Sequence, residues 1–465
     1  MAVNNFDFDS IVYDSRKAKP GSAFFCLRGL NSDGHDFAKS AYKNGARVFY
    51  CEQKLDLPDD ATQIVVPNTR KALSELSREF FDFPDKKLKI IGITGTKGKT
   101  SISNILYKIF NKYGLKAGLI GTNGISIDGK NYPTSNTTPE SYVLFESFKR
   151  MTDCGTKYCI MEVSSQAYKT GRVEGIEFDC AAFTNLSPDH IGIGEHESFE
   201  DYSYCKSLLF KNCLNAIINI DDENADFMIN ANNGKLTTYS IDNISDYRAE
   251  NINKWKSDSC LGVEFNLSNR KFRLSTPGKY SVYNFLCVLA ICKIYNIDFD
   301  FISKISSDIK VDGRFEIVDV KPGRTFIIDY AHNELSLDNV LYTIKSYNPK
   351  RLICLFGSVG DRTQLRRAKM AKVASKYCDF IIVTSDNPGC ESPENIMKDI
   401  VSGIENNTPY VTIADREEAI IYAVKNSHKG DVILLAGKGH ENYQLIGREK
   451  VPFSEREILL KLKTE

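Results

Sequence analysis

A glycine- and lysine-rich loop between a buried strand and a helix constrains the fold of this chain more than any other segment. The run Lys87–Thr94 is apolar enough for a buried strand, and it leads directly into a loop at residues 95–100. After the loop, apolar residues recur at helical spacing between residues 102 and 110. A strand, a tight loop and a helix in this order predict one unit of a parallel α/β sheet.

The loop has the residue types that bind nucleotide phosphates. Glycines let backbone N–H groups approach phosphate oxygens, and the start of the next helix adds a favourable dipole. Lys99 would neutralise charge on the β- and γ-phosphates, and the Thr100 hydroxyl would reach Mg²⁺. The pattern is a shortened G-x-x-G-K-T, because Ile93 stands where the longer form has its first glycine. The alternative is a flexible basic turn. We predict an ATP site made of Gly95, Thr96, Lys97, Gly98, Lys99 and Thr100.

The length and the pattern of segments predict three domains. The chain has 465 residues, and a domain averages about 150. Short apolar runs fill residues 1–86, the phosphate loop opens residues 87–312, and a second alternation of strands and helices fills residues 313–465. We predict an α/β protein with a small N-terminal α/β domain, a central P-loop domain with a mostly parallel sheet, and a C-terminal Rossmann-like domain.

Composition excludes several other classes of protein. Lys+Arg and Asp+Glu both number 60, so no overall basic surplus favours nucleic-acid binding. No apolar run approaches the ~20 residues of a membrane span, and no secretory signal is visible at the start of the chain. The 13 cysteines form no C-x-x-C pair and fit reduced thiols. We predict a cytoplasmic protein with small-molecule partners.

Two residues at the ends of later strands are candidate metal ligands for the phosphate site. Glu162 ends an apolar strand, and Mg²⁺ prefers oxygen ligands. His190 follows the strand that ends at Phe183, although imidazole is a less expected ligand for Mg²⁺. Each has a plainer interpretation: Glu162 as a surface carboxylate and His190 as a helix-capping residue.

Further segments resemble one family, the Mur ligases. The resemblance spans nearly the whole chain, and the ordered set of segments is far more specific than any one of them. At the N-terminus the matching residues are Asp14–Arg16 and Asp33–His35. The others are Gly95–Thr100, Asn136–Pro139, Met161–Ser165, Phe183–His190, Lys206–Phe210, Asp312–Glu316, Asp329–His332, Gly360–Arg362, Asp386–Pro388 and Gly437–Glu441. The chain is most similar to members that add the third amino acid to UDP-N-acetylmuramoyl-L-Ala-D-Glu.

The resemblance implies ATP and Mg²⁺ as cofactors and assigns catalytic roles. Lys99 would hold the ATP phosphates, and Thr100, Glu162 and His190 would bind metal. Lys206 resembles a lysine that the family carbamylates with CO₂, and the product is a carboxylate-like group that supports Mg²⁺. Without the family, Lys206 would be interpreted as a solvated helix lysine.

The resemblance also implies the remaining contacts to ATP and to the nucleotide-sugar substrate. Asn284 resembles an adenine contact, although Ser281 replaces a second family asparagine, and Arg314 and Asp329 resemble residues that close over ATP. The candidate contacts to the UDP-sugar-peptide are Ser15, His35, Thr137, Thr138, Ser164 and Arg172. Ser15 and His35 could equally be turn residues that cap local backbone.

The acceptor amino acid would bind to the C-terminal domain. The candidate contacts are Arg362, Asp386, Asn387, Gly437 and Glu441. In relatives that add diaminopimelate, an Arg follows the D-N-P motif and can bind the distal carboxylate. Gly389 stands there in this chain, so we expect a diamino acid without that carboxylate, with L-lysine favoured over meso-diaminopimelate. A compensating Arg elsewhere is the alternative.

Three rival functions are compatible with parts of the pattern. Folylpolyglutamate synthetase shares the ATP-dependent ligase plan but lacks the N-terminal nucleotide-sugar domain. A Mur-like paralogue could act on another carrier. A nucleotide-binding protein without catalysis would not need Lys206. We predict an ATP-dependent amide ligase of peptidoglycan precursor synthesis that acts as a monomer.

Overall fold

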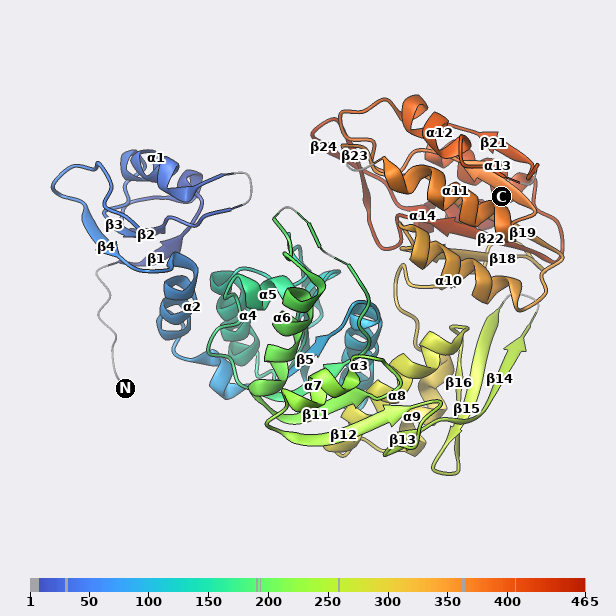
Figure 1. Ribbon diagram of the computed structural model, residues 1–465, viewed down its shortest axis with the longest axis horizontal. Helices are drawn as coiled ribbons and strands as arrows, with labels where there is room; N and C mark the ends of the chain where they lie inside the picture. Colours follow the sequence, from blue (N-terminus) through green and yellow to red (C-terminus); the bar gives the residue numbers. More distant parts are fainter. Residues whose placement is uncertain are drawn as a thin grey trace. The chain divides into compact units, whose positions relative to one another are not determined.

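The computed structural model describes residues 8–29, 32–189, 191–192, 194–257, 260–361, 364–405 and 407–464. The chain forms two compact units, one from residues 1–248 and 283–298 and the other from residues 249–282 and 299–465. Figure 1 follows the chain through both units by colour. The division into three domains at residues 86/87 and 312/313 stays a prediction.

The first unit begins with a small sheet of four parallel strands. The strands lie in chain order, and every residue of the second is buried. They are β1 (Ser10–Val12), β2 (Ser22–Phe25), β3 (Val48–Cys51) and β4 (Thr62–Val65). Two helices follow their strands, α1 (Ala38–Lys43) and α2 (Thr69–Phe80). The short apolar runs of the sequence therefore form strands, and burial is greatest in β2 and β3 and least in β4.

The rest of the first unit is built on a nine-stranded sheet in the order β13-β12-β11-β10-β5-β9-β6-β7-β8. The strands from β13 to β6 are parallel, and only β7 and β8 are antiparallel to their neighbours. The predicted mostly parallel sheet is confirmed. The strands are β5 (Lys89–Thr94), β6 (Ala117–Gly121), β7 (Gly124–Ile127), β8 (Lys130–Tyr132), β9 (Tyr158–Glu162), β10 (Phe178–Phe183), β11 (Cys213–Asn219), β12 (Lys235–Ser240) and β13 (Tyr247–Arg248).

Helices of this unit connect the parallel strands. The helix after the phosphate loop buries its apolar residues, including Leu106 and Phe110, as the helical spacing predicts. The connecting helices are α3 (Lys99–Lys112), α4 (Ser141–Asp153), α5 (Ser165–Lys169), α6 (Phe199–Lys211) and α7 (Ala225–Asn230). A further helix, α8 (Lys279–Ile294), belongs to this unit from Tyr283 onward and does not connect strands of the sheet. The carboxyl ends of β5, β9 and β10 lie at one edge of the sheet, which is where parallel α/β sheets bind ligands.

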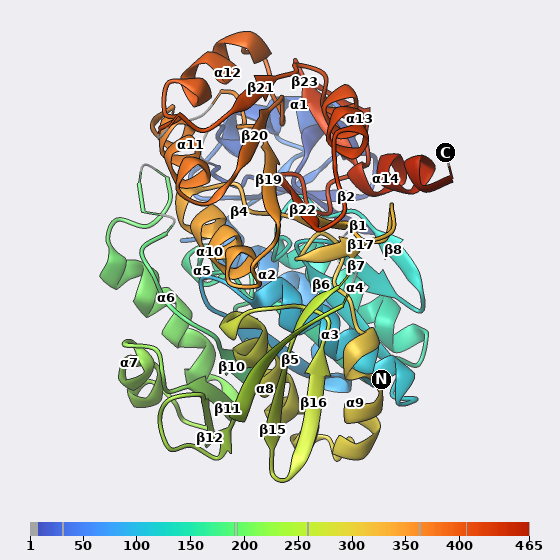
Figure 2. The same ribbon diagram turned by 90° about the vertical axis from the view of Figure 1, so that its right-hand side faces the viewer.

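The second unit contains a six-stranded sheet in the order β17-β18-β22-β19-β20-β21, parallel except for β17. Helices α10, α11 and α12 pack on one face, and α13 and α14 on the other, as Figure 2 shows. The strands are β17 (Glu316–Val318), β18 (Thr325–Asp329), β19 (Arg351–Phe356), β20 (Phe380–Val383), β21 (Tyr410–Thr412) and β22 (Asp431–Ala436). The helices are α10 (Glu334–Lys345), α11 (Leu365–Tyr377), α12 (Pro393–Val401), α13 (Arg416–Lys425) and α14 (Glu455–Thr464).

Two smaller features of the second unit were not predicted. One is an antiparallel sheet of β14 (Glu250–Lys256), β15 (Leu261–Leu267) and β16 (Arg270–Leu274), with the short helix α9 (Phe299–Ile305) against β16. The other is a hairpin of β23 (Tyr443–Ile446) and β24 (Glu449–Pro452). Both are rich in polar residues, so they lack the apolar runs that mark the parallel strands.

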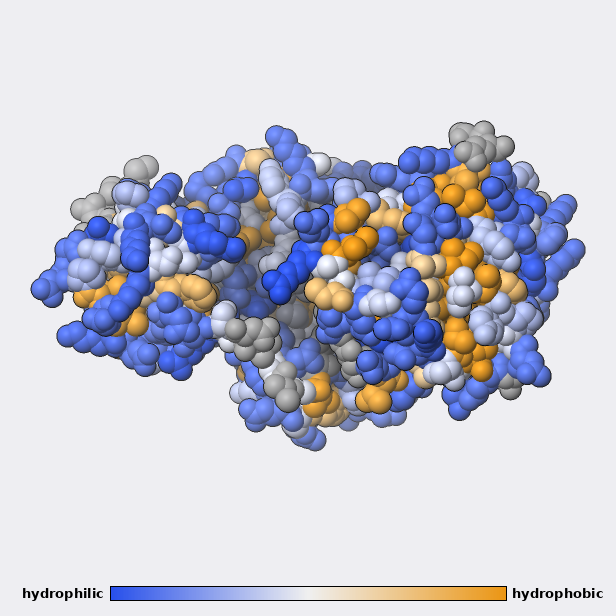
Figure 3. All heavy atoms as spheres, turned by 90° about the horizontal axis from the view of Figure 1, so that it is seen from above, coloured by the Kyte–Doolittle hydropathy of each residue, from blue (hydrophilic) through white to orange (hydrophobic). Residues whose placement is uncertain are grey.

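The surface in Figure 3 carries both hydrophilic and apolar residues. Hydrophilic residues cover most of the face in Figure 3, and apolar residues form patches among them. Among the described residues, no helix has both the length and the apolarity to cross a bilayer.

Candidate active site

The phosphate loop lies between β5 and α3, as the sequence predicts, and is tied to the loop after β10. The backbone N–H of Thr96 donates to the carbonyl of Asn185 at 2.8 Å, and that of Lys97 donates to the Asn185 side chain at 3.0 Å. Lys99 Nζ donates to the carbonyls of Gly95 at 2.7 Å and Thr96 at 3.2 Å. The lysine head is therefore held over the loop, where phosphate oxygens would compete for the same donor.

Asn284 of α8 contacts this loop, although it is remote in sequence. Gly98 has a φ of +92°, and a Cβ there would lie 2.5 Å from the side-chain oxygen of Asn284. Only glycine permits that approach together with that backbone conformation. The structure therefore brings together the predicted phosphate loop and the predicted adenine contact.

Glu162 is fully buried at the end of β9, next to Thr100. Its Oε2 accepts from Thr100 Oγ1 at 2.9 Å and from Thr122 Oγ1 at 3.1 Å, and its Oε1 accepts from the Thr122 N–H at 2.9 Å. These partners are neutral, and no ion pair joins Glu162 to a basic side chain within the described residues. A buried carboxylate with hydroxyl neighbours is a donor set that fits Mg²⁺.

Lys206 of α6 is also buried, with 2% of the residue exposed. Its Nζ donates to the carbonyl of Gly95 at 3.0 Å, the same oxygen that Lys99 contacts. Burial and the positive charge of Lys99 hold the pKa of the Lys206 amine well below its usual value. The interpretation of Lys206 as a solvated helix lysine is therefore wrong.

Four of the predicted substrate contacts form one cluster beside Glu162. Thr138 Oγ1 donates to the carbonyl of Glu162 at 2.9 Å and accepts from the N–H of Ser164 at 3.0 Å. Arg172 donates to the carbonyl of Thr138 at 3.0 Å, and the Thr137 hydroxyl contacts that of Thr122 at 3.1 Å. The cluster therefore contacts the backbone of Glu162, and the carboxylate of Glu162 accepts from Thr100 of the phosphate loop.

The two predicted contacts of the N-terminal sheet have partners within their own part of the chain. His35 is buried, and its Nε2 accepts from the N–H of Glu52 at 2.9 Å. Ser15 is buried too, and its carbonyl accepts from the side chain of Asn44 at 2.8 Å. Both residues order local loops here, and their contact with a nucleotide sugar stays a prediction.

The predicted acceptor residues gather at the carboxyl ends of β20 and β22. Asn387 donates to Glu441 at 2.9 Å and accepts from Lys438 Nζ at 2.8 Å, and Lys438 also donates to Glu441 at 2.7 Å. Asp386 is buried close to Gly437, where a Cβ would lie 2.5 Å from its carboxylate. Burial raises the pKa of the Asp386 carboxyl, and the nearby charges of Arg416, Lys438 and Arg366 act in the opposite direction.

Gly389 is held in a backbone conformation that suits glycine. Its φ is +59°, and a Cβ would lie 2.2 Å from Oδ2 of Asp361. That oxygen accepts from the N–H of Cys390 at 2.9 Å, so it is fixed in place. An arginine at this position would require the Asp361 side chain to move.

The other predicted ATP contacts belong to the second unit. The Asp329 carboxylate accepts from the N–H of Phe315 at 2.7 Å, and Arg314 lies over the ring of Tyr330, 4.5 Å from its centroid. These contacts place the two residues side by side at the end of β18. Two further predicted residues, His190 and Arg362, lie outside the described residues.

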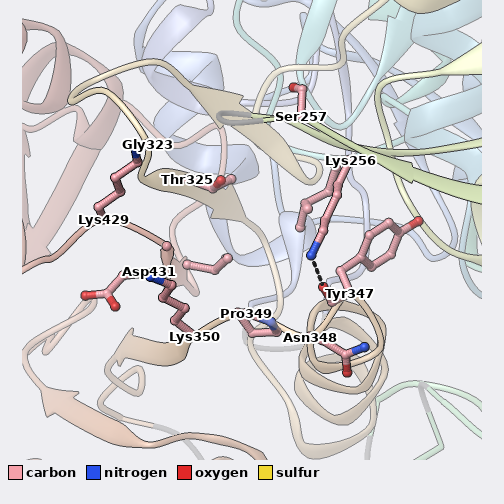
Figure 4. Close-up of a pocket in the computed structure, with 13 residues that line it drawn as sticks. Lys256, Ser257, Gly323, Thr325, Tyr347, Asn348, Pro349, Lys350, Lys429 and Asp431 are labelled. Carbon is pink, nitrogen blue, oxygen red and sulfur yellow. Dashed lines mark hydrogen bonds between the residues drawn. The ribbon is translucent and has the colours of Figure 1, made fainter.

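A cavity of about 390 Å³ lies elsewhere in the second unit, as Figure 4 shows. It is lined by the first residues of β18 and β22 and by Lys256, Lys350 and Lys429. Its position at the amino ends of the strands is opposite to the edge that carries Asp386. Lys256 donates to the carbonyl of Tyr347 at 3.3 Å, two residues after the end of α10. None of the predicted site residues lines this cavity.

Sequence reasoning missed three residues of the site. Lys438 is fully buried between Asn387 and Glu441, and its place inside the G-K-G-H-E motif could have indicated a role. Thr122, which binds Glu162, stands in no motif. Tyr202 contacts Thr96 and lies one helical turn before Lys206. The four-residue spacing from Lys206 could have indicated that the two side chains share one face of the helix.

Comparisons with known proteins cover the whole of this architecture. Three family descriptions match: "Mur ligase family, catalytic domain" at residues 7–81, "Mur ligase middle domain" at residues 93–292 and "Mur ligase, glutamate ligase domain" at residues 313–439. The UDP-N-acetylmuramoyl-L-alanyl-D-glutamate–2,6-diaminopimelate ligase of Caldanaerobacter subterraneus subsp. tengcongensis is 41% identical over 465 residues, 99% of this chain and 96% of the relative. The ligase of the same name from Bacillus velezensis is 41% identical over 466 residues, 97% of this chain and 93% of the relative.

Solved structures agree on the fold. A structure of a ligase with that same name has a TM-score of 0.69 and 29% identity, and covers 98% of this chain and 95% of its own. Folylpolyglutamate synthase of Mycobacterium tuberculosis, solved with ADP and AMPPCP, has a TM-score of 0.63 and 16% identity, and covers 79% of this chain and 92% of its own. At that identity the second likeness shows the fold alone.

Proposed function

The chain belongs to the Mur ligase family and is an ATP-dependent amide ligase of peptidoglycan synthesis, and we propose that it joins 2,6-diaminopimelate to UDP-N-acetylmuramoyl-L-alanyl-D-glutamate. The observation that carries the proposal is the 41% identity, over 465 residues, to a ligase named for this pair of substrates. The expected preference for L-lysine has no support in the comparisons, because these relatives are named for diaminopimelate.

The reaction would proceed in two steps. A carboxylate oxygen of the nucleotide-sugar peptide attacks the γ-phosphorus of ATP, and the bond to the β-phosphate oxygen breaks to release ADP. The amine of the acceptor then attacks the acyl carbon, the carbon–oxygen bond to phosphate breaks, and the amine loses a proton to solvent. The free energy of forming an amide from a carboxylate and an amine in water is unfavourable. Forming the acyl phosphate consumes ATP and activates the carboxylate, so the overall reaction becomes favourable.

We assign the residues of the site to these steps as follows. Lys99 and the N–H groups of the phosphate loop would hold the γ-phosphoryl group and offset its charge as it moves. Thr100 and Glu162 would hold Mg²⁺, which when bound neutralises charge on the phosphoryl oxygens. The cluster of Thr138, Ser164 and Arg172 would bind the carboxylate-bearing peptide beside them.

We also propose that Lys206 is carbamylated. Its neutral amine would attack the carbon of CO₂, a nitrogen–carbon bond would form, one C=O bond would become C–O⁻, and a proton would leave the nitrogen. The position of Lys206 Nζ, 3.0 Å from the Gly95 carbonyl, supports this proposal, because a carbamate there would lie beside the phosphate loop. The new carboxylate would complete the negative side of the Mg²⁺ site with Glu162.

The proposed acceptor requires a group to bind its distal carboxylate, because Gly389 has no side chain. Arg366 at the start of α11 is a half-buried guanidinium whose charge acts on Asp386 of the acceptor cluster. A planar guanidinium binds a carboxylate through two parallel hydrogen bonds. We therefore propose Arg366 as the residue that compensates for Gly389.

Replacing Arg366 with alanine is expected to raise the KM for diaminopimelate by about 10- to 100-fold, since a charged hydrogen bond contributes about 1.5–3 kcal/mol. The KM for ATP should change less than twofold. Steady-state kinetics with each substrate varied in turn would measure both, with Lys369→Ala of the same helix as the matched control. An unchanged KM for diaminopimelate would remove Arg366 from the acceptor site.

The experiment that tests the proposed function offers several amines in parallel. Purified protein would receive ATP, Mg²⁺ and UDP-N-acetylmuramoyl-L-Ala-D-Glu with diaminopimelate, lysine, ornithine or no amine. Phosphate release and product mass would be followed. A tripeptide product with diaminopimelate is expected. A product with lysine alone would restore the Gly389 argument, and no product with any amine would contradict the proposal.

The nucleotide substrates lead us to expect this reaction in the cytoplasm, where ATP and UDP-linked precursors are found. The prediction of a monomer stays a prediction, and light scattering of the purified protein would test it.

A further inference from the structure

His196 lies in the loop before α6 and is fixed through both of its ring nitrogens. Its Nε2 lies 2.8 Å from Ser165 Oγ, and its Nδ1 lies 3.0 Å from Oδ2 of Asp201. The side chain is completely buried. The same oxygen of Asp201 accepts from Lys169 Nζ at 2.6 Å, so the carboxylate that orients the ring is itself held. An imidazole bound on both sides has one orientation.

The fixed ring packs against Tyr202, and Tyr202 in turn faces the catalytic centre. The rings of His196 and Tyr202 meet edge to face, with centroids 5.2 Å apart. The Tyr202 hydroxyl contacts Thr96 Oγ1 of the phosphate loop at 3.1 Å. The face of its ring lies 4.5 Å from Lys206 Nζ. A continuous set of contacts therefore runs from α5 through His196 and Tyr202 to Lys206.

Two other functions of the residues around His196, a nucleophile triad and a metal site, fit the structure less well. Ser165, His196 and Asp201 have the order of a nucleophile triad, but Ser165 is only 3% exposed in the first turn of α5, so no substrate can reach it. His196, Asp201 and Cys205 could also hold a metal by distance. However, the Lys169 ammonium already binds the Asp201 carboxylate. Burial raises the pKa of the Cys205 thiol to about 12, so the thiol stays protonated, and a protonated thiol is a poor metal ligand.

We propose that His196 is a positioning residue, which holds the Tyr202 ring in the place that fixes Lys206 Nζ beside the phosphate loop. The inference rests on the proposed carbamylation of Lys206. A carbamate at Lys206 is stabilised only where its carboxylate meets the metal site. If the Tyr202 ring no longer packs against Lys206, the lysine side chain can adopt several rotamers. A smaller fraction of the molecules then has the Lys206 amine beside the phosphate loop.

The test measures the carbamate itself rather than the rate alone. Wild-type protein, His196→Gln and His196→Phe would be equilibrated over a range of bicarbonate concentrations. An alkylating reagent would then trap the carbamate for peptide mass spectrometry. His428→Gln is the matched control, because the His428 side chain is 76% exposed and lies in the second unit. Binding of ADP would count the folded sites in each sample.

We expect the bicarbonate concentration for half-maximal carbamylation to rise at least fivefold in both His196 variants. His428→Gln should match the wild type, and ADP binding should stay stoichiometric. The turnover number should fall while the KM for ATP changes less than twofold. The same half-maximal concentration in all proteins, or no trapped carbamate in the wild type, would overturn the inference. Amide formation measured on the same samples reports the proposed function separately.

Discussion

Lys206→Ala is expected to lower turnover by about three orders of magnitude, because the proposed carbamate and the negative charge that it would offer to Mg²⁺ are lost. Lys206 is buried, and its Nζ lies at the carbonyl of Gly95, where the proposed carbamate would form. Phosphate release and tripeptide formation would measure the loss. The smaller side chain leaves a cavity in α6, so the melting temperature and ADP binding would establish that the variant is folded.

The matched control is Lys211→Ala, which removes an exposed lysine from the last turn of the same helix. It should retain at least half of the wild-type turnover. Full activity of Lys206→Ala would show that no carbamate supports the metal in this chain. Partial recovery of that variant by added short carboxylic acids would support the carboxylate role.

Glu162→Gln is expected to lower turnover by about 10²–10³-fold, the size of effect seen when a charge-stabilising group is removed. The amide has the shape of the carboxylate, and its oxygen can still accept from the Thr122 N–H. The negative charge is lost, and the new N–H₂ group faces two hydroxyls that can adjust. The Mg²⁺ concentration for half-maximal activity should therefore rise with little change in stability.

Titration of the activity with Mg²⁺, at saturating ATP, would measure this shift. Glu174→Gln is the control, because Glu174 is an exposed carboxylate in the same unit. A Glu162→Gln variant with an unchanged Mg²⁺ requirement would show that the carboxylate orders the loops and does not bind the metal.

The parallel strands and their helices could be predicted from the sequence, and the reason is local. The strand β5 occupies Lys89–Thr94 and so begins two residues later than the predicted run that starts at Lys87. The strand β18, Thr325–Asp329, is likewise a short stretch with three adjacent apolar residues. Helix α2 begins at Thr69 because the Asn68 side chain caps it and accepts from the N–H groups of Arg70 and Lys71. A buried strand needs a continuous apolar run, and that signal is contained in five or six adjacent residues.

The antiparallel sheet of β14, β15 and β16 could not be predicted in the same way. Strand β14 is almost entirely exposed, and only one face of β16 is buried. Such strands are stabilised by pairing with a partner, and the partner is chosen by the fold. The hairpin of β23 and β24 could not be predicted for the same reason. Its Leu445 N–H donates to Asn387 in the acceptor cluster.

The sequence by itself determined the phosphate loop, because six adjacent residues carry both the backbone freedom and the charges that the site needs. It also determined most buried strands and, through the ordered motifs, the family. Only the tertiary structure decided which distant side chains meet: Glu162 with Thr122, Lys206 with the Gly95 carbonyl, and His196 with Ser165. Each pair joins segments that are separated in sequence. The pattern of apolar and polar residues in a short segment indicates where a strand or helix forms. The contacts between elements depend instead on the order and register of the strands in the sheet.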